Sequence, residues 1–207
     1  MELNKIYNMD CVEGMRQLPS NSIDLTVTSP PYDNLRTYNG FTWEFESVAK
    51  ELYRVTKQGG VVVWIVADAT IKGSETGTSF KQALFFKDLG FNLHDTMIWA
   101  KPGFTAVGTL KTRYASTFEY MFVFSKGKPK TFNPIKDRRN IYGGTKLSGT
   151  IRKRDGSTKP MSSNGKILSE YGIRFNVWNL CSERKVKTGH PAPFPEKIAN
   201  DHNIMEQ

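Results

Sequence analysis

Apolar and polar positions follow two different periods along the first 125 residues of the chain. Apolar side chains recur at helical spacing in three stretches, 11–20, 43–60 and 79–91. Gly59 and Gly60 are expected to end the second of these helices, and Gly90 the third. Between the helices lie apolar or β-branched runs, which predict strands at 3–9, 22–29, 61–68, 93–102 and 118–127.

This alternation of strands and helices predicts an α/β fold with an open, mostly parallel sheet. The strand at 61–68 is apolar up to Ala67, as expected of a central strand covered on both faces. Residues 126–189 have weak periodicity and many Gly, Ser, Thr, Lys and Arg residues. We therefore expect a loop-rich insertion or small second lobe at 126–189, after a core formed by 1–125.

The formal net charge of +9 is concentrated in that second region. Residues 126–188 carry 16 Lys and Arg against 4 Asp and Glu, a net charge of +12, whereas residues 1–125 carry 12 against 13. A surface of this kind suits phosphate groups, and nucleic acid is the commonest partner that offers them. A solvated basic loop is the alternative interpretation.

Cysteine and histidine usage argues against a metal site. Cys11 and Cys181 lie far apart, and neither has a histidine at metal-ligand spacing. The chain has no secretory signal pattern and no apolar run approaching 18 residues. We therefore expect a cytoplasmic protein with reduced thiols, no metal and no membrane association.

The segment Ser29-Pro30-Pro31-Tyr32 directly follows a predicted strand. Each proline fixes its own φ, removes a backbone donor and extends the residue before it. In open α/β sheets, ligands bind beyond the carboxyl ends of the strands. An outward carbonyl, the Ser29 hydroxyl and the flat Tyr32 ring would suit a heteroaromatic ring with an exocyclic amino group. A proline-rich turn with a surface tyrosine is the alternative.

The run "TSPPY" resembles the catalytic motif (D/N/S)-P-P-(Y/F/W) of the S-adenosylmethionine-dependent DNA amino-methyltransferases. The resemblance covers most of the chain, including "ELYRVTKQGGVVVWIVAD" at 51–68, "DTMIWAKPG" at 95–103 and "HPAPFPEKIANDH" at 190–202. The order of these segments is that of the β class. It implies a Rossmann-like methyltransferase sheet whose last strand is antiparallel, with a catalytic core at 1–125. It also implies a target-recognition region at 126–189 and the start of a cofactor-side segment at 190–207.

The resemblance also implies site residues. Catalysis would use Ser29, Pro30, Pro31 and Tyr32 on a base flipped out of double-stranded DNA. S-adenosylmethionine would contact Asp10, Cys11, His190, Pro191 and Phe194. DNA would contact Arg36, Arg138, Arg139, Arg152, Lys153 and Arg154. Asp10 can equally be a helix N-cap, Arg36 can form a surface salt bridge, and the basic clusters can be solvated.

Serine at the first position of the motif favours cytosine-N4 over adenine-N6 as the target, because it is commoner in cytosine-N4 enzymes of this family.

A segment that the family has is missing from this sequence. No D-P-F-x-G-S-G run follows the "HPAPFPE" segment, and the two strands that would separate the first strand from the Ser29 strand are absent. The sequence therefore predicts an incomplete sheet. The chain would be truncated or degenerate, its N-terminal strand would move into the gap, or a second chain would complete the site. A non-catalytic DNA-binding remnant or one subunit of a split enzyme is the alternative function.

Overall fold

The structure is a computed structural model that describes residues 1–32, 43–103, 111–181 and 195–206. It divides into two compact units, one formed by Met1–Asn133 with Asn176–Gln207 and the other by Pro134–Phe175. The second unit is shorter at both ends than the loop-rich region expected at 126–189. The difference arises because residues after Asn176 return to the main sheet as a strand, and residues up to Asn133 remain attached to it.

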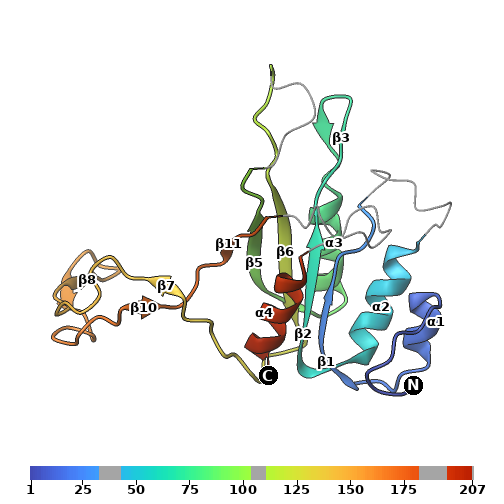
Figure 1. The fold of residues 1–207 in the computed structure, drawn as a ribbon, viewed down its shortest axis with the longest axis horizontal. Coiled ribbons are helices and arrows are strands. Elements are labelled where there is room, and N and C mark those ends of the chain that lie inside the picture. The colour runs from blue at the N-terminus through green and yellow to red at the C-terminus, as the bar shows by residue number, and fades with distance from the viewer. Residues whose placement is uncertain (33–42, 104–110, 182–194, 207) are drawn as a thin grey trace. The chain divides into compact units, whose positions relative to one another are not determined.

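A five-stranded sheet forms the centre of the first unit (Figure 1). Its strand order is β1 (Ile23–Thr28), β2 (Thr56–Val66), β6 (Phe118–Ser125), β5 (Asn92–Ala100) and β11 (Val177–Asn179). β1 is parallel to β2 and β11 to β5, whereas β6 is antiparallel to both of its neighbours. The expected mostly parallel sheet with an antiparallel last core strand is confirmed. β11 is an addition that the weak periodicity after residue 125 did not predict.

One face of the sheet is covered by α2 (Phe45–Val55) and α3 (Thr78–Asp88). Alternate residues of β2 point to this face, and Val62, Trp64 and Val66 are all buried there. The Phe86 ring of α3 stacks on Phe124 of β6 with centroids 4.6 Å apart. The indole Nε1 of Trp64 donates to the side-chain oxygen of Gln82 over 2.9 Å, which satisfies its only donor inside the core.

The opposite face carries the other alternate residues and α4 (Glu196–Glu206), which contacts β1. Val63, Ile65 and Met121 are buried on the strands, and Ile198 of α4 is fully buried as well. Because both faces are covered, β2 is apolar along most of its length, as the sequence predicted for a central strand.

The N-terminal strand expected at 3–9 is not formed. Residues 1–9 contain no strand, and Leu3 and Ile6 are exposed. Among the described residues β1 pairs with β2 alone, so no neighbouring strand is present to satisfy the backbone of this segment. The N-terminal residues therefore do not enter the sheet beside β1.

Gly59 and Gly60 do not end a helix, contrary to expectation, because α2 ends at Val55 and both glycines belong to β2. Gly59 has a φ of +82°, which favours glycine. A Cβ on Gly60 would lie 2.9 Å from the carbonyl oxygen of Asp24, so the close approach of β1 requires glycine. Gly90, in contrast, follows α3 with a φ of +109°, as expected of a helix C-terminal glycine.

The remaining strands are short antiparallel pairs. β3 (Thr70–Ile71) and β4 (Ser74–Glu75) form a hairpin after β2 in the first unit. The second unit contains the pairs β7 (Arg138–Arg139) with β10 (Tyr171–Gly172) and β8 (Thr150–Arg152) with β9 (Thr158–Pro160). None of the residues 134–175 is fully buried. The Arg174–Asp137 ion pair and the Arg138 guanidinium, 4.3 Å from the Phe175 ring centre, link the two ends of this unit.

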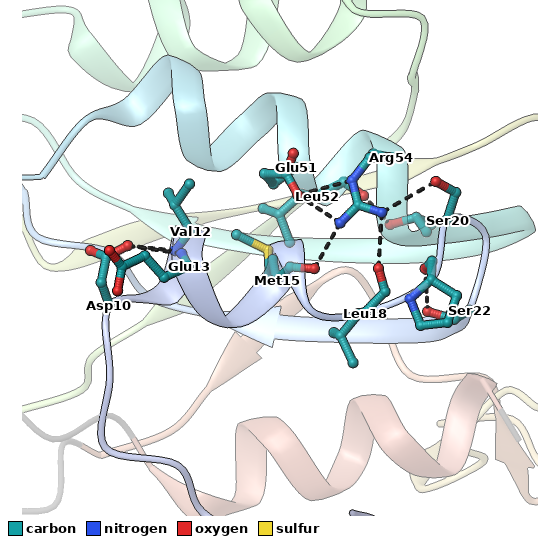
Figure 2. A network of polar contacts seen from close by, with 12 residues as sticks. Asp10, Val12, Glu13, Met15, Leu18, Ser20, Ser22, Glu51, Leu52 and Arg54 are labelled. Atoms are coloured by element: carbon teal, nitrogen blue, oxygen red, sulfur yellow. Dashed lines mark hydrogen bonds and ion pairs between the residues drawn. The ribbon is translucent and has the colours of Figure 1, made fainter. Parts of the chain in front are cut away.

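Arg54 ties α2 to the short helix α1 (Cys11–Arg16), which lies beside it (Figures 1 and 2). Its guanidinium donates to the carbonyl oxygens of Met15 and Leu18 over 2.7 and 2.9 Å and to the Glu51 carboxylate over 2.7 and 2.9 Å. At the other end of α1, Asp10 accepts from the backbone N–H groups of Val12 and Glu13. Both ends of this six-residue helix are therefore satisfied, which fixes the position of Asp10.

We predict that Arg54→Met lowers the free energy of unfolding by about 2 kcal/mol, because the α1 carbonyls and Glu51 lose a charged donor. Urea denaturation followed by circular dichroism measures this change. Lys50→Met is the matched control, since Lys50 pairs with Glu46 on the exposed surface of the same helix. We expect the control to cost less than about 0.5 kcal/mol. Equal effects of the two substitutions would contradict a special role for Arg54.

Candidate active site at the carboxyl edge of the sheet

Four residues with polar side chains lie at one edge of the main sheet. Ser29 directly follows β1, Asp68 follows β2 and Lys101 follows β5. These three strands run in the same direction, so their carboxyl ends share an edge. β6 runs the other way, and its second residue, Glu119, therefore lies at the same edge, opposite Trp99 of β5. The sheet thus gathers residues separated by up to 90 positions in the sequence.

A chain of hydrogen bonds links the proline corner to β6. The Ser29 hydroxyl and the Tyr32 hydroxyl lie 2.7 Å apart, and the Tyr32 hydroxyl donates to the Oε2 atom of Glu119 over 2.7 Å. The Oε1 atom of Glu119 forms an ion pair with the Lys101 ammonium. Ser29 and Tyr32 are partly buried, and the Tyr32 ring packs against the hydrophobic core. The corner is therefore fixed by side chains as well as by its two prolines.

Glu119 and Lys101 were not expected as site residues. Their side chains retain only 10% and 16% of their full exposure, so each offsets the cost of removing the other from water. The Lys101 ammonium also lies 4.3 Å from the centre of the Trp99 indole. The available signal in the sequence was a charged residue directly after one apolar run, Lys101, and another near the start of the next run, Glu119. Only the antiparallel register of β5 and β6 shows that the two charges meet.

Asp68 does not take part in this chain of hydrogen bonds and binds the start of α3 instead. Its Oδ1 atom accepts from the backbone N–H of Ser79 over 2.9 Å and from the Thr76 hydroxyl over 3.2 Å, and Ser79 also donates its hydroxyl to Oδ2. The carboxylate thus satisfies the N-terminus of α3, which starts after Gly77 without a side-chain cap of its own. Asp68 holds the β3–β4 hairpin and α3 in place at this edge.

Asp10 and Cys11 lie at the start of α1. The two N-capping bonds of Asp10 both use Oδ1, at 2.9 and 3.1 Å (Figure 2). The carboxylate is exposed, and its Oδ2 atom makes no hydrogen bond to the described residues. Partial burial and the neighbouring Asp10 charge raise the pKa of the Cys11 thiol.

The candidate DNA-contacting residues lie mostly in the second unit. Arg139 is exposed, whereas Arg138 is held by the carbonyl oxygen of Ile173 over 3.0 Å and by the Phe175 ring. The β8–β9 hairpin exposes the run from Arg152 to Arg154. Arg36, His190, Pro191 and Phe194 lie outside the described residues.

A polar hollow of about 550 Å³ lies beside the β3–β4 hairpin. The Arg113 guanidinium lines it and donates to the Thr70 hydroxyl over 3.0 Å and to the Gly73 carbonyl oxygen over 2.5 Å. Tyr114, next to it, is 98% exposed. The sequence around Arg113 carries no motif, and Lys111 is the other cation close to it in the chain.

The part of the chain that the structure describes contains no group of three or more His, Cys, Asp or Glu side chains that could hold a metal ion. Within the same residues, no helix has the length and apolar character needed to cross a membrane.

Comparison with known proteins identifies the family. A family model described as DNA methylase matches residues 23–202. The chain is 56% identical over 189 residues to the orphan methyltransferase M.BamHII of Bacillus amyloliquefaciens, an alignment that covers 87% of this chain and 70% of that protein. The chain belongs to the DNA methylase family. The resemblance to β-class DNA amino-methyltransferases that the "TSPPY" run indicated is thereby confirmed.

More distant relatives of the DNA methylase family are similar over most of this chain but are longer. The type II methyltransferase M.BglII of Bacillus subtilis is 27% identical, and the alignment covers 95% of this chain and 54% of that protein. Among solved structures, the PvuII DNA methyltransferase (cytosine-N4-specific) is similar with a TM-score of 0.63 and 20% identity, over 97% of this chain and 69% of that one. The M1.HpyAVI–SAM complex is similar with a TM-score of 0.52 and 14% identity, covering 95% and 71%. These two likenesses show the methyltransferase fold.

S-adenosylmethionine is the methyl donor of this family. Of the five candidate cofactor contacts, Asp10 and Cys11 belong to the described residues. The free Oδ2 atom of Asp10 is an exposed carboxylate acceptor of the kind that an adenine amino group or a ribose hydroxyl requires. The remaining candidate cofactor contacts, His190, Pro191 and Phe194, lie in a segment that the structure does not describe.

We predict that Lys101→Met lowers the free energy of unfolding by about 3 kcal/mol, because it leaves the Glu119 carboxylate buried without its counter-charge. Chemical denaturation measures the change. The double substitution Lys101→Met with Glu119→Gln should regain part of the loss, since no buried charge then remains. Lys57→Met is the control, because the Lys57–Asp24 pair is exposed and should contribute less than about 1 kcal/mol. A loss no larger than that of the control would contradict the prediction.

Proposed function

We propose that this chain transfers a methyl group from S-adenosylmethionine to the exocyclic amino group of a base flipped out of double-stranded DNA, with cytosine-N4 as the favoured target. The observation that carries the proposal is the fixed corner at the carboxyl edge of the sheet, where the Ser29 and Tyr32 hydroxyls lie 2.7 Å apart and Tyr32 is bonded to Glu119. A rigid acceptor group beside an aromatic ring is what a planar base with an amino group requires.

In this proposal the chain positions the base. An amino group inside a stacked duplex is inaccessible, so the base must leave the stack. The Ser29 hydroxyl oxygen and the Pro30 carbonyl oxygen accept its two N–H groups, and the Tyr32 ring stacks on its face. Holding both protons directs the nitrogen lone pair away from Ser29 and Pro30. The cofactor would supply a methyl group from its sulfonium, whose C–S bond breaks as the new N–C bond forms and leaves a neutral thioether, and the methylated nitrogen would then release one proton to solvent. Catalysis comes from orientation and from acceptors for the charge that develops on nitrogen.

The choice of cytosine over adenine rests on Ser29 at the first position of the motif. A serine hydroxyl is shorter than the carboxylate or amide of Asp or Asn, the residues commoner in adenine-N6 enzymes of the family. The fold likeness to a cytosine-N4-specific enzyme is compatible with this choice but does not decide it.

The second unit is proposed to contact DNA. Residues 134–175 carry ten Lys and Arg against three Asp and Glu, a net charge of +7. Four of their exposed members, Arg139, Arg152, Lys153 and Arg154, are proposed to contact phosphate, and Arg36 and Arg138 complete the proposed set. Phosphate contacts of this kind give affinity and orientation but carry no sequence information.

One feature favours a second candidate function, in which this chain is one subunit of a split enzyme or a DNA-binding module without catalysis of its own. β1 pairs with β2 alone among the described residues, so its other edge can accept a strand from a second chain. The two candidates differ in whether the chain by itself transfers methyl groups.

We predict that the purified chain transfers tritiated methyl groups from S-adenosylmethionine to unmethylated bacterial DNA, and that nucleoside analysis yields N4-methylcytosine. Ser29→Ala should lower kcat about 100-fold, because the amino group loses an acceptor. Ser47→Ala, on α2, is the control and should leave kcat unchanged. N6-methyladenine as the product would overturn the choice of base. No transfer by a folded wild-type chain would favour the second candidate.

A further prediction concerns the β8–β9 hairpin. Replacing Arg152, Lys153 and Arg154 together by Gln should weaken DNA binding and reduce the slope of log K against log salt by about 2 to 3. The physical reason is that three fewer counterions are released on binding. Fluorescence anisotropy at a series of NaCl concentrations measures the slope. Lys81→Gln, on exposed α3 surface, is the control; an unchanged slope in the triple variant would place the phosphate contacts elsewhere.

A further inference from the structure

The proton positions in the Ser29–Tyr32–Glu119 chain can be assigned from its composition. The Glu119 carboxylate, paired with Lys101, can only accept hydrogen bonds. Tyr32 has one hydroxyl proton, and it is donated to Oε2 of Glu119 over 2.7 Å. The 2.7 Å bond between the two hydroxyls must therefore be donated by Ser29 to Tyr32. The single proton of Ser29 is thus directed toward Tyr32, and only the lone pairs of its oxygen remain for a ligand.

We propose that Glu119 is a positioning residue that makes the Ser29 pocket select an amino group over a carbonyl group. The inference rests on the proposed function, because it takes the ligand to be an extrahelical base. Cytosine offers an N–H donor at the position where uracil has a carbonyl oxygen, and adenine differs from hypoxanthine in the same way. A hydroxyl that can only accept binds the amino base, whereas it faces the carbonyl base with two acceptors and no proton between them.

The charge of Glu119 decides the direction of the whole chain. A glutamine at this position would have nearly the same shape, but its amide N–H₂ group could donate to the Tyr32 hydroxyl. Tyr32 would then donate to Ser29, and Ser29 could turn its proton toward the ligand. The pocket would offer a donor as readily as an acceptor, with no loss of packing. The direction therefore depends on the carboxylate and not on the volume of the side chain.

Lys101 and the backbone keep this arrangement fixed. The Lys101 ammonium supplies the opposite charge that a nearly buried carboxylate requires. Glu119 of β6 pairs with Trp99 of β5, and Trp99 is the last residue but one of β5. Since both partners stand on neighbouring strands, the register of β5 against β6 keeps their side chains within reach of each other.

The test uses the full chain and DNA duplexes with one unpaired base, which leaves the stack at low cost. Duplexes with a single unpaired cytosine or uracil, and a second pair with adenine or hypoxanthine, are compared by fluorescence anisotropy. We expect the wild-type chain to bind the amino base at least about tenfold more tightly than its carbonyl counterpart. Glu119→Gln should reduce this ratio by about tenfold. Some preference should persist, because the Pro30 carbonyl can only accept.

Glu46→Gln is the matched control, because Glu46 forms an exposed ion pair with Lys50 on α2 and should leave the ratio unchanged. Tyr32→Phe breaks the link, so Glu119→Gln added to Tyr32→Phe should change the ratio no further. Melting temperatures identify any variant that does not fold. Where methyl transfer occurs, Glu119→Gln should lower kcat by about 10- to 100-fold with little change in KM for DNA, a split that simple loss of folded protein would not give.

Two results would overturn the inference: a wild-type chain that binds amino and carbonyl bases equally or not at all, or a folded Glu119→Gln variant with an unchanged ratio. The binding measurement needs no methyl transfer. A chain that discriminates between the bases but transfers no methyl group would therefore contradict the proposed enzyme activity and leave the role of Glu119 standing.

Discussion

The antiparallel position of β6 between β2 and β5 is the constraint on which the rest of this structure depends. A parallel strand would bring its last residues to the edge where β1, β2 and β5 end, but an antiparallel one brings its first residues. Glu119 therefore reaches Tyr32 across 87 residues of sequence and meets Lys101 at the end of the neighbouring strand. Reversing β6 would place Ser125, not Glu119, at this edge, and the corner at Ser29 would lose its fixed partner.

The helix ends show how the fold distributes polar groups that it cannot leave unpaired. Asp68 satisfies the N-terminus of α3, Asp10 caps α1, and Arg54 bonds the carbonyl oxygens at the other end of α1. Each of these charged side chains completes a helix end near the sheet edge or beside α2. Hydrogen bonds to charged side chains therefore hold α1, next to the candidate cofactor residue Asp10, and α3, which follows the β3–β4 hairpin. These bonds act in addition to the hydrophobic core.

Charge and packing are divided between the two units. The first unit contains the continuous aromatic core around Trp64 and Phe86 and has nearly balanced charge. The second unit, Pro134–Phe175, has short strand pairs, little buried surface and a large excess of Lys and Arg. A segment with so many cations and so few buried apolar groups gains little from a core of its own, which agrees with a role in contacting a polyanion.

The sequence by itself determined the central strands, α2, α3 and the fold class, because a period of 3.6 or 2 in apolar residues is a local signal. It also determined the proline corner at Ser29–Tyr32 and the basic second region, which are contiguous in the chain. The strand that the sequence predicts at 3–9 is not formed in the structure, because a strand needs a neighbouring strand to pair with. Gly59 and Gly60 were misassigned for a related reason: only the close approach of β1 shows why glycine is required there.

Only the tertiary structure shows β11, because a strand of three residues in a weakly periodic region leaves no pattern in the sequence. It also decided the partners of the corner. Glu119, Lys101 and Tyr32 come from three separate segments, and no spacing rule in a sequence gives the register of β5 against β6. The sequence therefore supplied the chemical groups of the candidate site, and the antiparallel register decided which of them share hydrogen bonds and in which direction the protons point.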